Sequence, residues 1–373
     1  MENISQSTCS VIPPHMHWRV AEHGDAAQRR RAAATLSHMA LLNAARAAVI
    51  RAGSAAAAVM PRAKQRFIYD AGGGTLLPGA LVMSEGGKRS PDLEAREAFD
   101  GAGATYDFFA KVFLRDSIDG RGMRLDSTVH YGTDFLNAMW NGQQMVYGDG
   151  DGKLFNRFTT AVDVIAHELT HGLTQYTAGL IYQGETGALN EHISDSFGIM
   201  VKQFLLNQTV TDSDWLIGVG LLGPRVRGKA VRSMKAPGTA YDDPVLGKDP
   251  QPAHMRNYVH TSDDNGGVHI NSGILNNAFY RASMALGRFS WVVTGRIWHY
   301  VLTEMLRSRA SFQEFANATV IAAGEMYGFG GSVQRAVIEA WAQVGLPTPP
   351  SLMQRPASGG NRPGSGRPAI VVN

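Results

Sequence analysis

The spacing of two histidines constrains this chain more than any other feature of its sequence. His167 and His171 enclose Glu168 in the run His-Glu-Leu-Thr-His, inside a segment whose apolar residues recur at helical intervals. Residues four apart in an α-helix project from one face, about one turn from each other. Both imidazoles can therefore reach one zinc ion at the usual distance of about 2.0–2.1 Å, and Glu168 is placed beside the metal, where it can accept a proton from water.

A third protein ligand must come from elsewhere in the chain. A catalytic zinc site has three protein ligands and one open position, where bound water has a pKa near neutrality. Thr174 and Thr177 stand where the longer motif HExxHxxGxxH would place glycine and a third histidine. A later predicted helix carries Glu191 and Asp195 on one face, which suits one ligand and one carboxylate that orients a histidine. A solvated acidic face is the usual alternative for such a pair.

Composition limits the class of protein and its partners. The 373 residues, 44% of them hydrophobic, suffice for two or three domains with sizeable cores. The net charge of +3 is small, and the clearest basic cluster, at 29–31, lies near the N-terminus, so we expect no nucleic-acid partner. The single cysteine, Cys9, cannot form an intrachain disulfide. Residues 1–14 lack the apolar run of a Sec signal, and no window of about 20 apolar residues predicts a membrane span, so we expect a soluble protein.

Periodicity divides the chain into two unlike halves. Residues 28–49 carry apolar side chains at helical spacing after a Pro-containing extended leader. From 67 to 151, short β-type runs alternate with Gly-rich turns, together with one or two predicted helices, among them 91–114. Helical patterns then dominate, at 160–177, 187–206, 271–286, 292–308, 311–326 and 331–344. A β-rich half followed by a helical half is the α+β class, and the Pro-, Gly- and Ser-rich residues after Leu346 predict a disordered tail.

Several runs beyond the histidine motif belong to one recognisable pattern. Together with HELTH and GALNEHISD, the runs at 137–142, 145–152, 176–182, 232–234 and 264–273 resemble the thermolysin-like (M4) neutral zinc metallopeptidases over roughly 65 to 345. The resemblance implies a two-domain zincin fold with the HExxH helix at the cleft. We expect four segments: an N-terminal propeptide at 1–62, a β-rich catalytic domain at 63–178, a helical catalytic domain at 179–347 and a disordered tail at 348–373.

The resemblance also implies a role for each matching site residue. It implies one catalytic zinc ion, whose ligands would be His167, His171 and Glu191. Glu168 would be the base, and Asp195 would orient His167. Stabilisation of the tetrahedral intermediate falls to His269, held by Asp264, and to Tyr182. The substrate backbone would be gripped by Asn137, Ala138 and Arg232.

The implied reaction is hydrolysis of protein and peptide bonds by a metalloendopeptidase that uses zinc-activated water. Negative charge develops on the carbonyl oxygen during such a reaction, and zinc, a phenol and an imidazolium can each stabilise it. The family favours cleavage on the N-terminal side of bulky hydrophobic residues, and we expect Val164 and Val231 to line the pocket for that residue. The alternatives are a zinc-stabilised binding protein that keeps the fold as a scaffold, and a peptidase that stays permanently latent.

The sequence departs from the family's usual calcium site. Asp163 and Asp214 match two calcium-binding positions, but Lys202, Leu216 and Val219 stand where further acidic ligands would be expected. Calcium takes roughly six to eight oxygen ligands, and an ammonium group in the site repels it. We therefore expect the calcium site to be absent, with the Lys202 side chain in place of the cation.

The N-terminal segment is short for a secreted member of the family. Its run Val11-Ile-Pro-Pro14 resembles the short propeptide of the protealysin-like subgroup, which implies a zymogen whose own propeptide inhibits it until removal between about Val49 and Arg66. A disordered leader is the plain alternative. Cys9 can in principle cap the zinc as a thiolate, although a lone cysteine in a leader is more often incidental. Family membership favours secretion, and the missing Sec signal leaves a cytoplasmic location as the alternative.

Overall fold

A mixed five-stranded sheet forms the first half of the catalytic region. The computed structural model of the protein describes residues 9–52 and 63–354. The sheet has the strand order β2-β1-β3-β5-β4, with bounds β1 (Arg66–Asp70), β2 (Ala80–Ser84), β3 (Leu125–Val129), β4 (Ala138–Trp140) and β5 (Met145–Tyr147). β1, β3 and β5 run parallel, whereas β2 and β4 each pair antiparallel with a neighbour. β4 is therefore an edge strand, with one row of backbone groups open to another segment.

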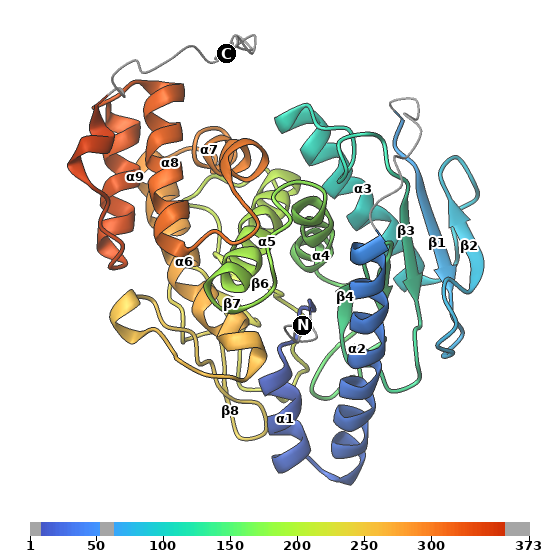
Figure 1. Ribbon diagram of the computed structural model, residues 1–373. Coiled ribbons are helices and arrows are strands. Elements are labelled where there is room, and N and C mark those ends of the chain that lie inside the picture. The colour runs from blue at the N-terminus through green and yellow to red at the C-terminus, as the bar shows by residue number, and fades with distance from the viewer. Residues whose placement is uncertain (1–8, 53–62, 355–373) are drawn as a thin grey trace.

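Helices dominate the second half, as the periodicity predicted. α3 (Leu93–Phe113) covers the sheet and begins at Asp92, whose side chain accepts a hydrogen bond from the backbone N–H of Ala95. The other helices of the catalytic region are α4 (Val162–Gln175), α5 (Gly184–Leu205), α6 (Asp264–Leu286), α7 (Thr294–Tyr300), α8 (Phe312–Tyr327) and α9 (Ser332–Gln343), with a π-helical turn at Val301–Met305. The short strands between α5 and α6 are β6 (Leu216–Ile217), β7 (Arg232–Ser233), β8 (Asp242–Asp243) and β9 (Gly247–Lys248). The predicted α+β class and two-part architecture are confirmed (Figure 1).

Helix α4 lies between two hydrophobic cores. Its residues Val164, Ile165 and Leu169 belong to the core that also contains sheet residues, whereas Ala166 and Leu173 belong to the core of the helical half. Residues 163–174 are therefore all buried, although they include two histidines, a glutamate and an aspartate. Figure 1 shows α4 and α5 in the middle of the molecule, with the sheet on one side and α6 to α9 on the other.

The N-terminal segment folds onto the catalytic region instead of trailing from it. The predicted extended leader is wrong beyond Pro13, because α1 (Pro14–His23) begins at Pro14, whose fixed φ suits the first turn of a helix. α2 (Ala26–Ala52) follows, where a helix was predicted at 28–49. Val11, Ile12, Met16 and other residues of this segment are buried in the same core as the sheet.

The helix at 26–50 and the C-terminal tail differ from what the sequence predicted. By length and composition alone, the helix at 26–50 could cross a membrane, contrary to our expectation that no window would qualify. In this fold Met39 and Leu42 of that helix pack against Tyr131 and Phe135. The predicted tail begins with an ordered 3-10 turn, Pro350–Met353, because Gln334 donates a hydrogen bond to the Leu352 carbonyl (2.8 Å). The rest of the tail and residues 53–62 are outside the described part of the chain.

Candidate metal centre and substrate cleft

The three predicted metal ligands converge at one buried point. The Nε2 atoms of His167 and His171 are 3.1 Å apart, and the Glu191 carboxylate lies 3.4 Å from the first and 3.3 Å from the second. Ligand atoms at about 2.0–2.1 Å from a tetrahedral zinc ion lie about 3.3 Å from one another. All three side chains have an exposed fraction of 0%. The separations therefore fit a single zinc ion held between α4 and α5.

Outer hydrogen bonds orient both imidazoles toward that point. His167 Nδ1 donates to Asp195 Oδ1 (2.8 Å) and His171 Nδ1 donates to Asn190 Oδ1 (2.8 Å). With the Nδ1 protons engaged, the two Nε2 lone pairs face each other, and Glu191 Oε2 is buried without a hydrogen-bond partner. Such an arrangement is unfavourable unless a proton or a cation lies between the atoms. The donor set therefore fits a bound metal ion.

Glu168 lies beside this point but is held apart from the ligands. Its Oε2 atom accepts a hydrogen bond from the backbone N–H of Trp140 (2.9 Å), and its Oε1 atom is buried without a partner. Burial raises the pKa of Glu168 to about 7, with Glu191 adding to the rise and His167 opposing it. A carboxylate with a pKa near neutrality is suited to accept and return a proton.

His269 and Tyr182 also lie next to Glu191. Asp264 Oδ1 accepts from His269 Nδ1 (2.6 Å), and Asp264 Oδ2 accepts from the backbone N–H of the same histidine (2.9 Å). Burial opposes a charge on this imidazole, but Asp264 and Glu191 raise the pKa of His269 above its ordinary value. Tyr182 donates a hydrogen bond to Glu191 and lies 3.2 Å from His269 Nε2. Two donors therefore point to the space beside the metal ligands.

Asp195 connects the metal site to the substrate cleft. It accepts two hydrogen bonds from the Arg232 guanidinium (2.8 Å each) and a third from Asn276 (2.8 Å), besides the bond from His167. Burial alone would raise the pKa of Asp195, but Arg232 and His167 hold it well below its usual range. The close packing of α5 on α4 depends on Gly198, where a Cβ would lie 2.6 Å from the Asp163 carbonyl. A single buried carboxylate therefore serves both a metal ligand and an arginine.

The N-terminal segment occupies the cleft where a substrate backbone was predicted to bind. Val11 N–H donates to the Ala138 carbonyl of edge strand β4 (3.2 Å), and Arg232 donates to the Val11 carbonyl (3.0 Å). Ser10 accepts from His269 Nε2 at its carbonyl oxygen (3.1 Å). Asn137 forms hydrogen bonds with Ile12. All three predicted substrate-binding residues thus contact this segment.

The two residues predicted to line the apolar pocket are buried in this structure. Val164 and Val231 are buried in the same core cluster as Val11. Their exposed fractions are 0%, 2% and 0% respectively, so no water reaches this part of the cleft while the segment is bound. A side chain that enters the cleft at the position of Val11 therefore meets an apolar surface.

Lys202 takes the position that was considered for calcium. Its ammonium donates to both oxygens of Asp214 (2.9 and 3.1 Å) and to the Leu216 carbonyl (3.0 Å), and it lies 3.4 Å from Asp163 Oδ2. The lysine thus compensates the charge of both aspartates with one cation of the protein's own. Val219, at a position where a further acidic calcium ligand would be expected, is 41% exposed.

Two polar residues near the site were missed by sequence reasoning. Asn190 orients His171, and its position next to Glu191 in a helix was the available signal. Arg46 reaches the site from α2, where its guanidinium lies near Cys9 and Glu168. Nothing in the Ala-rich pattern around Arg46 indicated a buried role, because only the docking of α2 brings it to the cleft.

This fold and site define a metallopeptidase of the HExxH class with a two-part catalytic region and a bound N-terminal segment. Family models match most of the chain: the catalytic domain of thermolysin metallopeptidases matches residues 63–175, and their alpha-helical domain matches residues 178–346. The chain belongs to the thermolysin family of metallopeptidases, and is a metalloendopeptidase.

Individual relatives support the same assignment. The chain is 49% identical to the "Extracellular metalloprotease" of Pectobacterium carotovorum subsp. carotovorum, over 92% of this chain and 97% of that protein. It is 41% identical to the "Thermolysin" of Alicyclobacillus acidocaldarius subsp. acidocaldarius, over 75% of this chain and 50% of that protein. The structure of the precursor of protealysin, a metalloproteinase from Serratia proteamaculans, superposes with a TM-score of 0.83 and 49% identity, covering 90% of this chain and 99% of the other.

Proposed function

We propose that the protein is a zinc-dependent endopeptidase made as a zymogen, whose residues 1–62 inhibit it and whose residues 63–178 and 179–347 form the catalytic unit. The observation that carries the proposal is the convergence of the two histidines and Glu191, with separations of 3.1, 3.4 and 3.3 Å, on one buried point. A zinc ion bound there would act as a Lewis acid toward a peptide carbonyl and activate water for attack.

The chain's own groups supply the remaining chemistry. Glu168 accepts the proton of the attacking water and delivers it to the leaving amine, since its unpartnered Oε1 atom is free to do so. The imidazolium of His269, oriented by Asp264, and the phenol of Tyr182 donate hydrogen bonds to the carbonyl oxygen as negative charge develops. Asp195 keeps His167 in the tautomer that presents Nε2.

Substrate binding follows the contacts of the N-terminal segment. Asn137, Ala138 and Arg232 hold an extended backbone on the edge of β4, as they hold residues 10–12. A bulky hydrophobic residue just after the scissile bond would enter the apolar pocket that Val164 and Val231 line. Because the bound segment covers this cleft, removal of the segment is required before a protein substrate can enter. The printed name of the Pectobacterium relative supports action outside the cell.

Hydrolysis of casein tests this proposal. We expect activity after maturation, its loss on treatment with 1,10-phenanthroline, its return with added zinc, and no activity in Glu168→Ala. Mass spectrometry of the purified protein is expected to show a shorter active chain that begins between about residues 49 and 66, and the intact chain in Glu168→Ala if the enzyme cuts itself. A processed, zinc-loaded protein without activity would refute the proposal in favour of a binding role.

A further inference from the structure

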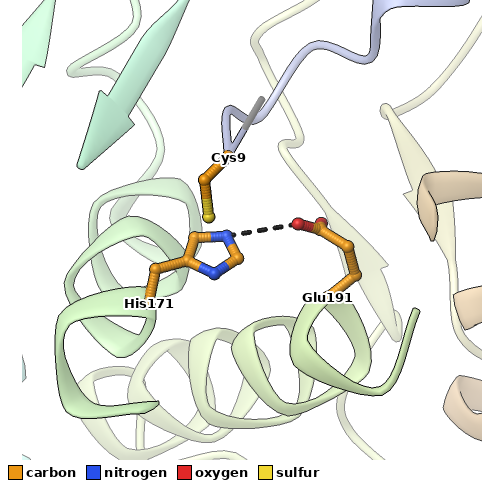
Figure 2. Close-up of side chains that lie close together, drawn as sticks. All are labelled: Cys9, His171 and Glu191. Atoms are coloured by element: carbon orange, nitrogen blue, oxygen red, sulfur yellow. Dashed lines mark ion pairs between the residues drawn. The ribbon is translucent and has the colours of Figure 1, made fainter. Parts of the chain in front are cut away.

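A cysteine from the N-terminal segment reaches the metal point. The Sγ atom of Cys9, one carboxylate oxygen of Glu191 and one ring nitrogen of His171 all lie within 4.8 Å of one another. Figure 2 shows the thiol pointing toward the space between the histidine and the glutamate, which come from α4 and α5. Cys9 has an exposed fraction of 0%. The thiol is therefore close to two of the three predicted metal ligands.

The backbone next to Cys9 fixes the thiol in this place. Hydrogen bonds at Ser10, Val11 and Ile12 tie the three following residues to His269, Ala138, Arg232 and Asn137. Residues so anchored leave Cys9 little freedom to turn away from the cleft. The position of the thiol is therefore a consequence of how the segment binds.

We propose that the Cys9 thiolate is the fourth zinc ligand of the precursor and closes the catalytic metal site until the segment is removed. The inference rests on the proposed zinc function. A catalytic zinc site keeps one position open, whereas a structural site has four protein ligands, of which thiolate sulfur is a favoured kind. When the Zn–S bond forms, the thiol proton passes to solvent and the water that would otherwise take the fourth position is released. The resulting set of one sulfur, two imidazoles and one carboxylate has no position left for a substrate carbonyl.

A second buried group supports this role independently. Arg46, on α2, is 4% exposed and lies close enough to Cys9 for the two groups to interact electrostatically, while its Nε and Nη1 atoms have no hydrogen-bond partner. A guanidinium stays charged in proteins, and it lies here beside a thiol and close to Glu168. Burial favours the neutral thiol of Cys9, and the nearby guanidinium opposes this preference, so a thiolate held by a metal ion would have a cation beside it. Glu191 Oε2, buried without a hydrogen-bond partner, also faces a site that needs a cation.

The opposing explanation is that Cys9 is a small apolar residue that fills space. It does contact Tyr182 and Val268 in a minor apolar cluster. X-ray absorption at the zinc edge separates the two explanations, because a Zn–S distance of about 2.3 Å differs from Zn–N and Zn–O distances of about 2.0–2.2 Å. Since the chain has a single cysteine, a thiolate ligand could come from no other residue.

The experiment uses the full chain with Glu168→Ala, which prevents self-cleavage. Further variants in this background are Cys9→Ser, and Ser10→Ala as a control that alters the neighbouring residue and keeps the thiol. We expect one sulfur ligand at about 2.3 Å in the parent and in Ser10→Ala, and only nitrogen and oxygen ligands in Cys9→Ser. Replacement of zinc by cobalt is expected to give a sulfur-to-cobalt absorption band in the near ultraviolet with the same dependence on Cys9.

Zinc content measured on the same samples keeps the two proposals apart. About one bound zinc per chain with no sulfur neighbour in the parent would overturn the role of Cys9 and leave the proposed function intact. Absence of tightly bound zinc from every variant would overturn the proposed function itself. If Cys9→Ser fails to fold, the spectrum of the parent alone still decides, since sulfur scattering at the zinc edge is either present or absent.

Discussion

Asn137 and Ile12 exchange two hydrogen bonds. The Ile12 N–H donates to Asn137 Oδ1 (3.0 Å), and Asn137 Nδ2 donates to the Ile12 carbonyl (2.9 Å). A side-chain amide thus makes the pair of bonds that a neighbouring strand would make, and it extends the pairing that Val11 begins on the edge of β4. In the proposed function, the same amide would bind a substrate backbone after removal of the segment.

Asn137→Ala is therefore expected to weaken the binding of both the N-terminal segment and the substrate. The change leaves the Ile12 N–H and carbonyl without partners, which costs about 1–3 kcal/mol, or roughly 5- to 150-fold in binding. We expect faster loss of the segment from the precursor and a higher KM in the processed enzyme. Asn207→Ala, on the surface, serves as the control. Unchanged values of both quantities would show that the amide does not hold an extended backbone.

The Asp195 carboxylate is expected to be essential for stability and for metal binding. In Asp195→Asn, Arg232 becomes a buried guanidinium without a counterion, which typically costs about 3–5 kcal/mol. Loss of the carboxylate partner of His167 is expected to weaken zinc binding about 10- to 100-fold. Urea unfolding and competition with a zinc chelator measure the two effects. The exposed Asp242→Asn is the matched control, and equal behaviour of the two variants would contradict the prediction.

Lys202 is expected to make stability independent of calcium. Because its ammonium lies against Asp163 and Asp214, the melting temperature of the wild type is expected to stay the same with calcium or a calcium chelator. Lys202→Ala is expected to lose about 2–3 kcal/mol of folding stability, less than the roughly 3–5 kcal/mol of a fully buried ion pair, because Asp214 is 41% exposed. Lys248→Ala, at an exposed site, is the control. A wild-type melting temperature that rises markedly with calcium would refute this role.

Acid is expected to loosen the N-terminal segment. His17 is buried against Asn137 (3.3 Å), and burial lowers its pKa to about 3, from an ordinary value of 6.5. The released segment therefore binds a proton more readily than the bound one. The bound state is most favoured above pH 6.5 and loses stability as the pH falls toward 3, by about 2 kcal/mol at pH 5 from this histidine.

Trypsin sensitivity of the Glu168→Ala precursor across this pH range measures the effect. We expect cleavage after the arginines at 29–31, corrected for the pH dependence of trypsin, to increase below pH 6.5. His17→Gln is expected to flatten the increase, while His23→Gln, at an exposed histidine of the same helix, leaves it unchanged. An identical pH profile in all three proteins would assign the loosening to other groups.

Local spacing along the chain determined much of the catalytic centre. His167 and His171 face one point because they are one helical turn apart, and Glu191 and Asp195 are matched in the same way on α5. The family resemblance then indicated that the two helices meet, together with His269 and Asp264. These relationships could be predicted because the residues in each are close together in the sequence or belong to a recognisable motif.

Tertiary packing alone decided how the N-terminal segment meets this centre. Cys9 lies near Glu191, and Arg46 near Glu168, across separations of more than one hundred residues that no local period encodes. α1 forms where an extended leader was expected, because its buried face packs into the core that the sheet and α4 provide. The sequence by itself thus determined the class of enzyme and predicted its metal ligands, through helical periodicity and motif. Only the folded structure decided what covers the ligands, because burial of the segment depends on surfaces that both halves of the catalytic region create together.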